Sequence, residues 1–115
     1  MGTCIISRTL GSSGVKNAVL ESVRHAYNQG TSTFDASSYT YVVSFCVQAY
    51  IDGYSGAYVG GTYLATFDVA KNVKLDTGNT SYFTQEIANG TITTTLVNSM
   101  SSLNSNWTIY FCCLY

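Results

Sequence analysis

One stretch in the middle of the chain, from Tyr41 to Ile51, alternates between two sets of side chains. Successive side chains of a β-strand point to opposite faces of a sheet, so this run predicts a long strand with one buried face. The two predicted faces are Tyr41, Val43, Phe45, Val47, Ala49 and Ile51 on one side, and Val42, Ser44, Cys46, Gln48 and Tyr50 on the other. The fold must therefore contain a sheet.

A second alternating run follows the glycine-rich segment 52–61. In this run Tyr63, Ala65, Phe67 and Val69 would share one face. Two alternating runs joined by turn-forming residues are typical of an antiparallel hairpin. We therefore expect the two runs to pair, with a long mobile tip between them.

Turn signals divide the rest of the chain into further strands. Asn89-Gly90 is typical of a tight turn in which both residues take positive φ angles. This turn would join a strand over 81–87 to another over 91–94. A terminal strand, buried on at least one face, is predicted from the alternation of Trp107, Ile109, Phe111 and Cys113.

Two other segments show the three- and four-residue spacing of helices. The first has apolar residues at Val15, Val19, Leu20, Val23, Ala26 and Tyr27. Ser12 or Ser13 would cap its start and Gly30 would end it. Leu96, Met100 and Leu103 predict a second, short helix. The predicted fold class is therefore α+β: mainly antiparallel β-sheet, with an N-terminal amphipathic helix and a short second helix before the last strand.

The size and composition predict a single β-rich domain over 1–115, in which residues 1–14 form an arm or a flexible start. The chain has 115 residues, of which 46% are hydrophobic and 10% charged, so it should bury a core. Its formal net charge is −1 and its five basic residues are scattered, so nucleic-acid binding is not expected. No apolar run approaches the roughly 18–20 residues that span a bilayer, and no membrane partner is expected. Sparse surface charge opposes self-association weakly, which predicts a surface covered by other subunits or partners.

The four cysteines, Cys4, Cys46, Cys112 and Cys113, match no zinc-site spacing. Adjacent Cys112 and Cys113 would point to opposite faces of a strand, which prevents an unstrained bridge between them. The favoured interpretation is free, mostly buried thiols that act as small apolar residues. The alternative is one disulfide that involves Cys4 or Cys46.

The single histidine, His25, would lie on the first helix one turn after Glu21, and we expect an ordinary surface pair. The chemical alternative makes His25 the base for a nucleophilic Cys46, with Asp35 or an asparagine orienting the histidine. Neither residue sits in a recognisable catalytic motif. We therefore predict no catalytic residue, no metal and no cofactor, and a protein that is not an enzyme.

Tyrosines cluster around the predicted hairpin tip, and the candidate binding residues are Tyr50, Tyr54, Tyr58 and Tyr63. Tyrosine, serine and glycine together form adaptable contact surfaces, and aromatic rings also stack on sugars. Three interpretations remain open for these residues: recognition of a ligand by the tip, packing between subunits, and the ordinary use of tyrosine in strands.

Three short runs carry a resemblance to a protein family: Leu64-Ala65-Thr66-Phe67-Asp68-Val69, Leu75-Asp76-Thr77-Gly78 and Asn89-Gly90-Thr91-Ile92. With the strands rich in serine, threonine, asparagine, glycine and tyrosine, they resemble accessory virion proteins of tailed bacteriophages. The resemblance implies a protein made in the host cytoplasm with free thiols, located in the virion, and assembled as a symmetric oligomer in a capsid, tail or fibre.

The expected function is therefore that of a structural or interaction protein that assembles through β-sheet faces. The partners would be further copies of the chain or other structural proteins. The alternative is a carbohydrate-binding, lectin-like module that uses the tyrosine- and glycine-rich loop, and a small enzyme is the third hypothesis. The N-terminus lacks the basic segment and long apolar core of a signal peptide, which predicts synthesis in the cytoplasm.

Overall fold

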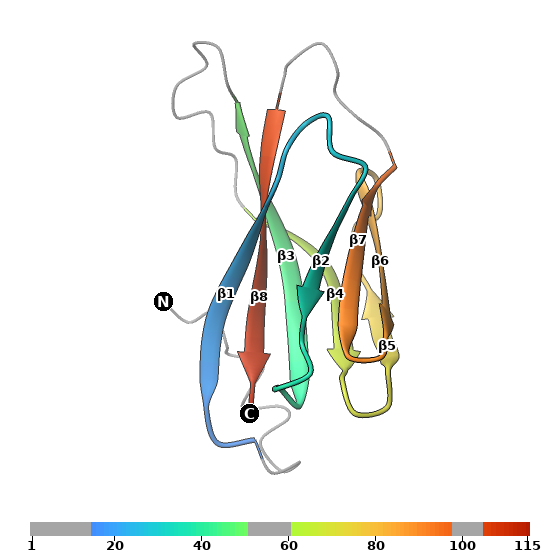
Figure 1. Ribbon diagram of the computed structural model, residues 1–115. Helices are drawn as coiled ribbons and strands as arrows, with labels where there is room; N and C mark the ends of the chain where they lie inside the picture. Colours follow the sequence, from blue (N-terminus) through green and yellow to red (C-terminus); the bar gives the residue numbers. More distant parts are fainter. Residues whose placement is uncertain (1–14, 51–60, 98–104) are drawn as a thin grey trace.

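The computed structural model describes residues 15–50, 61–97 and 105–115, and within these ranges every regular element is a β-strand. The strands are β1 (Ala18–His25), β2 (Thr31–Asp35), β3 (Tyr41–Tyr50), β4 (Thr62–Asp68), β5 (Val73–Thr77), β6 (Phe83–Ala88), β7 (Thr91–Leu96) and β8 (Ser105–Leu114). They form two antiparallel sheets, a five-stranded one in the order β1-β8-β3-β4-β5 and a three-stranded one in the order β2-β7-β6 (Figure 1). The described part of the chain is a β-sandwich, and the predicted α+β class is wrong.

The predicted N-terminal helix is instead strand β1, which pairs with β8 over its whole length, from Ala18 opposite Leu114 to His25 opposite Trp107. Val19 and Val23 are four residues apart, and residues at this spacing share a face in a strand as well as in a helix. Pairing with β8 decides between the two structures, because β8 would otherwise present an unpaired edge to water. Valine, branched at Cβ, also favours the strand.

Several predictions fall outside the described residues. These are the arm over 1–14, the tip of the first hairpin and the positions of Met100 and Leu103 in the predicted second helix. Leu96, the first residue of that predicted helix, is described, and it is the last residue of strand β7.

Strands β3 and β4 form the antiparallel hairpin that the two alternating runs predict. The buried face of β3 carries Val42, Ser44 and Cys46, whereas the more apolar set that starts with Tyr41 and Val43 is half-buried on the opposite face. The register shifts where Ser44 pairs with Ala65 and Phe45 with Tyr63, which leaves Leu64 as an extra residue. Because of this bulge, Tyr63 does not share a face with Ala65 and Phe67 as predicted.

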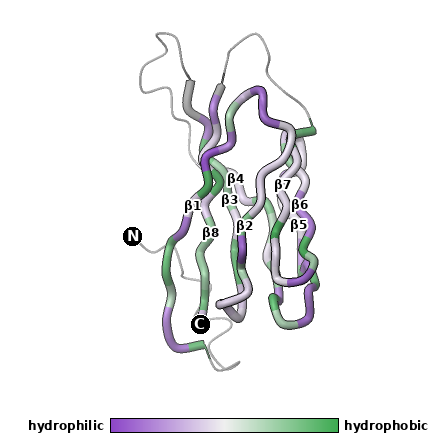
Figure 2. Tube along the Cα trace, viewed as in Figure 1, coloured by the Kyte–Doolittle hydropathy of each residue, from purple (hydrophilic) through white to green (hydrophobic). Residues whose placement is uncertain are grey.

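The tight turn at Asn89-Gly90 is confirmed, since φ is 51° at Asn89 and 74° at Gly90. It joins β6 to β7, which pair from Ala88 opposite Thr91 to Phe83 opposite Leu96. Strand β8 is also confirmed as the buried terminal strand. It lies between β1 and β3 in the larger sheet, and Figure 2 shows hydrophobic residues along much of its length.

The core lies between the two sheets and contains two groups of aromatic rings. In one group Phe34 of β2 stacks on Phe111 of β8, with ring centroids 4.2 Å apart. In the other, Trp107 contacts Phe83 edge-on, at a centroid distance of 5.0 Å. Between them the buried Gln85 side chain of β6 donates to Ser44 Oγ at 2.7 Å and to Thr94 Oγ1 at 3.0 Å. These contacts fix the position of one sheet over the other.

Candidate interaction surface

The five-stranded sheet has a second face, opposite the core, which we call the outer face. Three aromatic side chains lie side by side on it, because Tyr63 of β4 pairs with Phe45 of β3, and Phe45 pairs with Tyr110 of β8. The rings of Phe45 and Tyr110 are stacked, with centroids 5.3 Å apart and an interplanar angle of 15°. None of the three is fully buried. The outer face therefore presents an aromatic row, which the sequence did not single out beyond Tyr63.

Tyr63 is held by the strand next to it. Its hydroxyl group contacts Thr66 Oγ1 at 2.6 Å and donates a hydrogen bond to the carboxylate of Asp76 on β5. Burial, and then the bond to Asp76, raise the pKa of Tyr63 to about 12. The polar end of this tyrosine is thus occupied within the fold, although the residue as a whole is 37% exposed.

The other candidate tyrosines are placed only in part. Tyr50 ends β3, where its backbone is opposite Ser105 of β8, and its side chain is not described. Tyr54 and Tyr58 lie outside the described residues. The recognition of a ligand or a glycan by this cluster therefore stays a prediction.

Among the described strands, the two sheets have four edges, which are β1, β5, β2 and β6. An edge strand exposes unpaired backbone groups that can pair with another chain unless it is short, bulged or guarded by charge. Strand β2 has only five residues. Strand β5 also has five, and its register with β4 is broken between Thr66 and Phe67. Both are poor templates for a second chain.

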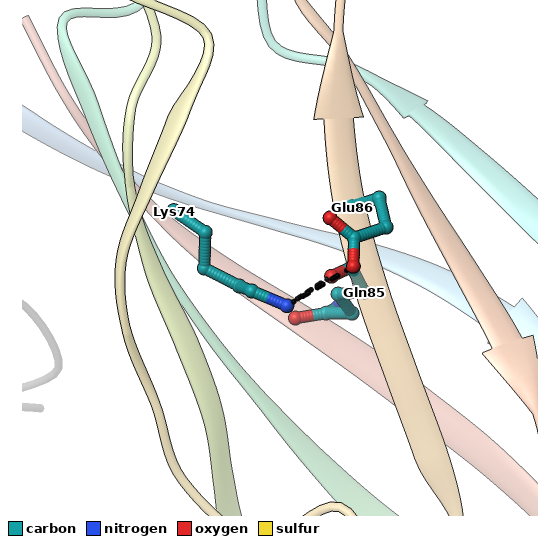
Figure 3. A network of polar contacts seen from close by, with 3 residues as sticks. All are labelled: Lys74, Gln85 and Glu86. Atoms are coloured by element: carbon teal, nitrogen blue, oxygen red, sulfur yellow. Dashed lines mark hydrogen bonds and ion pairs between the residues drawn. The ribbon is translucent and has the colours of Figure 1, made fainter.

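The edge of β6 is closed by Lys74 of β5 (Figure 3). The ammonium group of Lys74 donates to the backbone oxygen of Gln85 at 2.8 Å and lies 3.3 Å from Glu86 Oε1. A charged side chain that occupies a backbone acceptor of an edge strand prevents pairing at that point.

Strand β1 differs from the other three edges. It has eight residues in continuous register with β8, without a bulge. The β1 side chains on the outer face are all exposed, and only one of them, Arg24, is charged. They are Ala18, Leu20, Ser22 and Arg24. Leu20 is 39% exposed. Of the described edges, β1 is the one that is long, regular and weakly guarded.

The two side chains of the catalytic alternative, His25 and Cys46, are both buried. His25 is fully buried, so the predicted surface pair with Glu21 is wrong. Its Nε2 donates to the backbone oxygen of Gln29 at 2.8 Å, and the hydroxyl of Ser32 donates to Nδ1 at 2.9 Å. Both ring nitrogens are thus engaged, and neither contacts Cys46. Burial raises the pKa of the Cys46 thiol to about 11, which disfavours the thiolate a nucleophile needs.

Because His25 is buried, we expect the stability of the protein to fall in mild acid. Burial lowers the pKa of His25 below 6.5, and the backbone bond to Gln29 opposes this only in part. As the pH drops below about 6.5, His25 binds a proton in the unfolded chain but stays neutral in the folded protein. The free energy of unfolding therefore falls. Urea unfolding at pH 7 and pH 5 should show this loss in the wild type. His25→Gln should lack it, and an equal pH dependence in both proteins would contradict the assignment.

The three described cysteines have two outcomes, and Cys4 lies outside the described residues. Cys46 and Cys113 are free and buried, as the favoured interpretation expects. Cys112 is disulfide-bonded, so the prediction of free thiols is wrong at this residue. Burial, followed by the negative charge of Glu21, raises the pKa of Cys113 to about 12. Neither free thiol is therefore activated.

Across 15–50, 61–97 and 105–115, no helix has the length and hydrophobicity to cross a membrane. No cluster of three or more histidine, cysteine or acidic side chains suited to a metal ion occurs in the same ranges. No protein-family model, curated protein or solved structure matches the chain.

Proposed function

We propose that this protein is a structural protein that self-associates through strand β1, so that the five-stranded sheets of two copies join into one continuous sheet. The observation that carries the proposal is the contrast among the four edges. Strands β2 and β5 are short, β6 is closed by Lys74, and β1 is long, regular and weakly guarded. A homotypic dimer needs a self-complementary surface, and an antiparallel strand pair about a two-fold axis provides one.

The faces of the two sheets determine which register is favourable. Core-facing residues of one copy must lie opposite core-facing residues of the other, because opposed residues of antiparallel strands share a face. One such register places Ser22 opposite Ser22, with Leu20 opposite Arg24 and Glu21 opposite Val23. A shift by one step would place Glu21 opposite Glu21, and like charges directly opposite each other are destabilising. We therefore expect Ser22 at the two-fold axis.

Ser22→Lys tests this arrangement. Two ammonium groups would then face each other at the axis, and we expect the dimer to dissociate at least tenfold more readily. Light scattering over a dilution series measures the effect. Thr33→Lys is the matched control, since Thr33 is also exposed on an edge strand, β2, and its dimer should be unchanged.

Two results would contradict the proposal. One is a wild-type protein that stays monomeric at high concentration. The other is a dimer that the two lysine variants weaken equally. Circular dichroism of each variant shows whether the fold is retained. Assembly of this kind suits the virion role that the resemblance to bacteriophage proteins implies, and that role stays a prediction.

A further inference from the structure

Three turns meet at Gly90, in the tight turn that joins β6 to β7. The Gly90 amide donates a hydrogen bond to Asn72 Oδ1 at 2.8 Å, and its backbone oxygen accepts one from Ala36 N, also at 2.8 Å. Asn72 lies in the turn between β4 and β5, and Ala36 follows β2. A Cβ atom at Gly90 would lie 3.0 Å from Ser37 Cβ, so the turn is also tightly packed. Contacts from two other turns therefore hold Gly90 in place.

The residue pair in this turn is chemically reactive. Asn89-Gly90 is the one place in the chain where glycine follows asparagine. Asparagine is a thermolabile residue, and glycine has no side chain to hinder attack by its own backbone nitrogen on the side chain before it. Asn89 is exposed to solvent. In an unfolded chain we expect this pair to close to a cyclic imide, with loss of the asparagine side-chain nitrogen.

We propose that Asn89 is a site of spontaneous covalent modification and that Asn72 suppresses the reaction in the folded protein. The nucleophile of the reaction is the backbone nitrogen of Gly90, which must lose its proton. In the structure that proton is donated to Asn72 Oδ1, and a hydrogen bond to the neutral form of a group opposes its ionisation. Rotation of the Gly90 amide towards the Asn89 side chain would also break this bond. The proposal involves no residue of β1 and is independent of pairing through that edge.

The suppression depends on two turns that only folding brings together. Asn72 and Asn89 are the non-glycine residues with positive φ among those that the structure describes, and φ is 51° at each. Asparagine tolerates this backbone conformation better than most residues do. Asn72 is 18 residues before Gly90 in the chain and belongs to a different hairpin. An unfolded chain therefore has no fixed acceptor for the Gly90 amide.

Release of the Gly90 amide would permit the reaction. Its nitrogen bonds to Cγ of Asn89, the bond from Cγ to the side-chain nitrogen breaks, and ammonia leaves with the proton from Gly90. Water then opens the ring at either carbonyl carbon, which yields aspartate or isoaspartate. Isoaspartate carries the main chain through Cβ and lengthens a turn in which Ala88 is directly opposite Thr91. A tight two-residue turn does not fit an extra backbone atom, so the modification would break the contacts of Gly90 with the other two turns.

Deamidation of variants at Asn72 tests the proposal. Asn72→Gly removes the acceptor and keeps a residue that tolerates positive φ. We expect Asn89 to deamidate about fivefold faster in this variant, the factor that one hydrogen bond of ordinary strength contributes. Asn72→Asp is the matched control, because it keeps an oxygen acceptor of the same shape, and its rate should stay near that of the wild type. Trypsin digestion and fragmentation in a mass spectrometer identify the modified residue, and circular dichroism shows whether each variant folds.

The wild-type protein provides a second test, which decides the matter if Asn72→Gly does not fold. Asn89 should deamidate roughly tenfold more slowly in the folded protein than in guanidinium at the same pH, because the turn must open before the ring can form. The Gly90 amide should also be protected from hydrogen exchange. Equal rates in the folded and unfolded protein or an unprotected Gly90 amide would overturn the proposal. So would a folded Asn72→Gly variant that reacts no faster than the wild type, or equal acceleration by Asn72→Gly and Asn72→Asp.

Discussion

Replacement of Phe111 by alanine should lower the free energy of unfolding by about 3–5 kcal/mol, the usual cost of removing a fully buried aromatic side chain. Phe111 is 1% exposed, and its ring stacks on Phe34 of the opposite sheet with an interplanar angle of 7°. The substitution removes a contact that joins the two sheets. Such a loss is a large part of the 5–15 kcal/mol that stabilises an ordinary domain. Urea unfolding followed by tryptophan fluorescence measures it.

Phe45→Ala is the matched control for Phe111→Ala. Phe45 is a neighbour of Phe111 in the same sheet, since Ser44 is opposite Phe111 and Phe45 is opposite Tyr110. Its ring lies on the outer face and is half-buried, so its removal should cost less than half as much as that of Phe111. Equal losses would mean that the outer face is as deeply packed as the core, and the assignment of the two faces would be wrong.

Much of the sheet could be predicted from the sequence, because its signals are local. Strands β3 and β8 alternate over most of their length, and a period of two has no helical counterpart. Asn89-Gly90 specifies its turn through the two positive φ angles that asparagine and glycine tolerate. These features need no information from distant parts of the chain.

Strand β1 could not be predicted in the same way, because its spacing is ambiguous. The four-residue interval from Val19 to Val23 fits both a helix and a strand. Glu21 lies between them, and its charge is typical of the polar face of a helix. In the strand, however, Glu21 faces inward and accepts a hydrogen bond from the Tyr39 hydroxyl at 2.9 Å. That contact joins residues distant in the chain. The branched valines were the local signal that favoured a strand.

The candidate surface was predictable only at the level of residue type. Tyrosines near a hairpin tip suggested a contact region, but the sequence does not show that Asp76 binds the hydroxyl of Tyr63. The weakly guarded edge of β1 was also hidden, because an edge exists only once the strand order is known. The partners of His25 were hidden for the same reason, since they come from the Gln29 loop and from Ser32 of β2.

Gly78→Ala should lower the free energy of unfolding by about 2–4 kcal/mol, the combined cost of overpacking and of weakened hydrogen bonds. A Cβ atom at Gly78 would lie 2.4 Å from both Cδ2 and the backbone oxygen of Tyr63. The backbone cannot yield locally, because Gly78 N donates to the oxygen of Leu64 at 2.7 Å and Asn79 N donates to that of Tyr63 at 2.9 Å. The methyl group must therefore push the end of β5 away from β4.

Gly30→Ala separates this effect from the general consequences of replacing glycine. Apart from Gly30 itself and its two chain neighbours, no residue comes within 4 Å of the Cβ position at Gly30, and its φ is not in the left-handed region. Alanine there restricts the unfolded chain without a clash, so stability should be unchanged or rise by up to about 1 kcal/mol. Chemical denaturation measures the free energy of unfolding of the two variants. It should fall clearly for Gly78→Ala, and for Gly30→Ala it should stay the same or rise. If Gly78→Ala were as stable as Gly30→Ala, the close contact between Gly78 and Tyr63 would not exist, and the aromatic row would lose its support from β5.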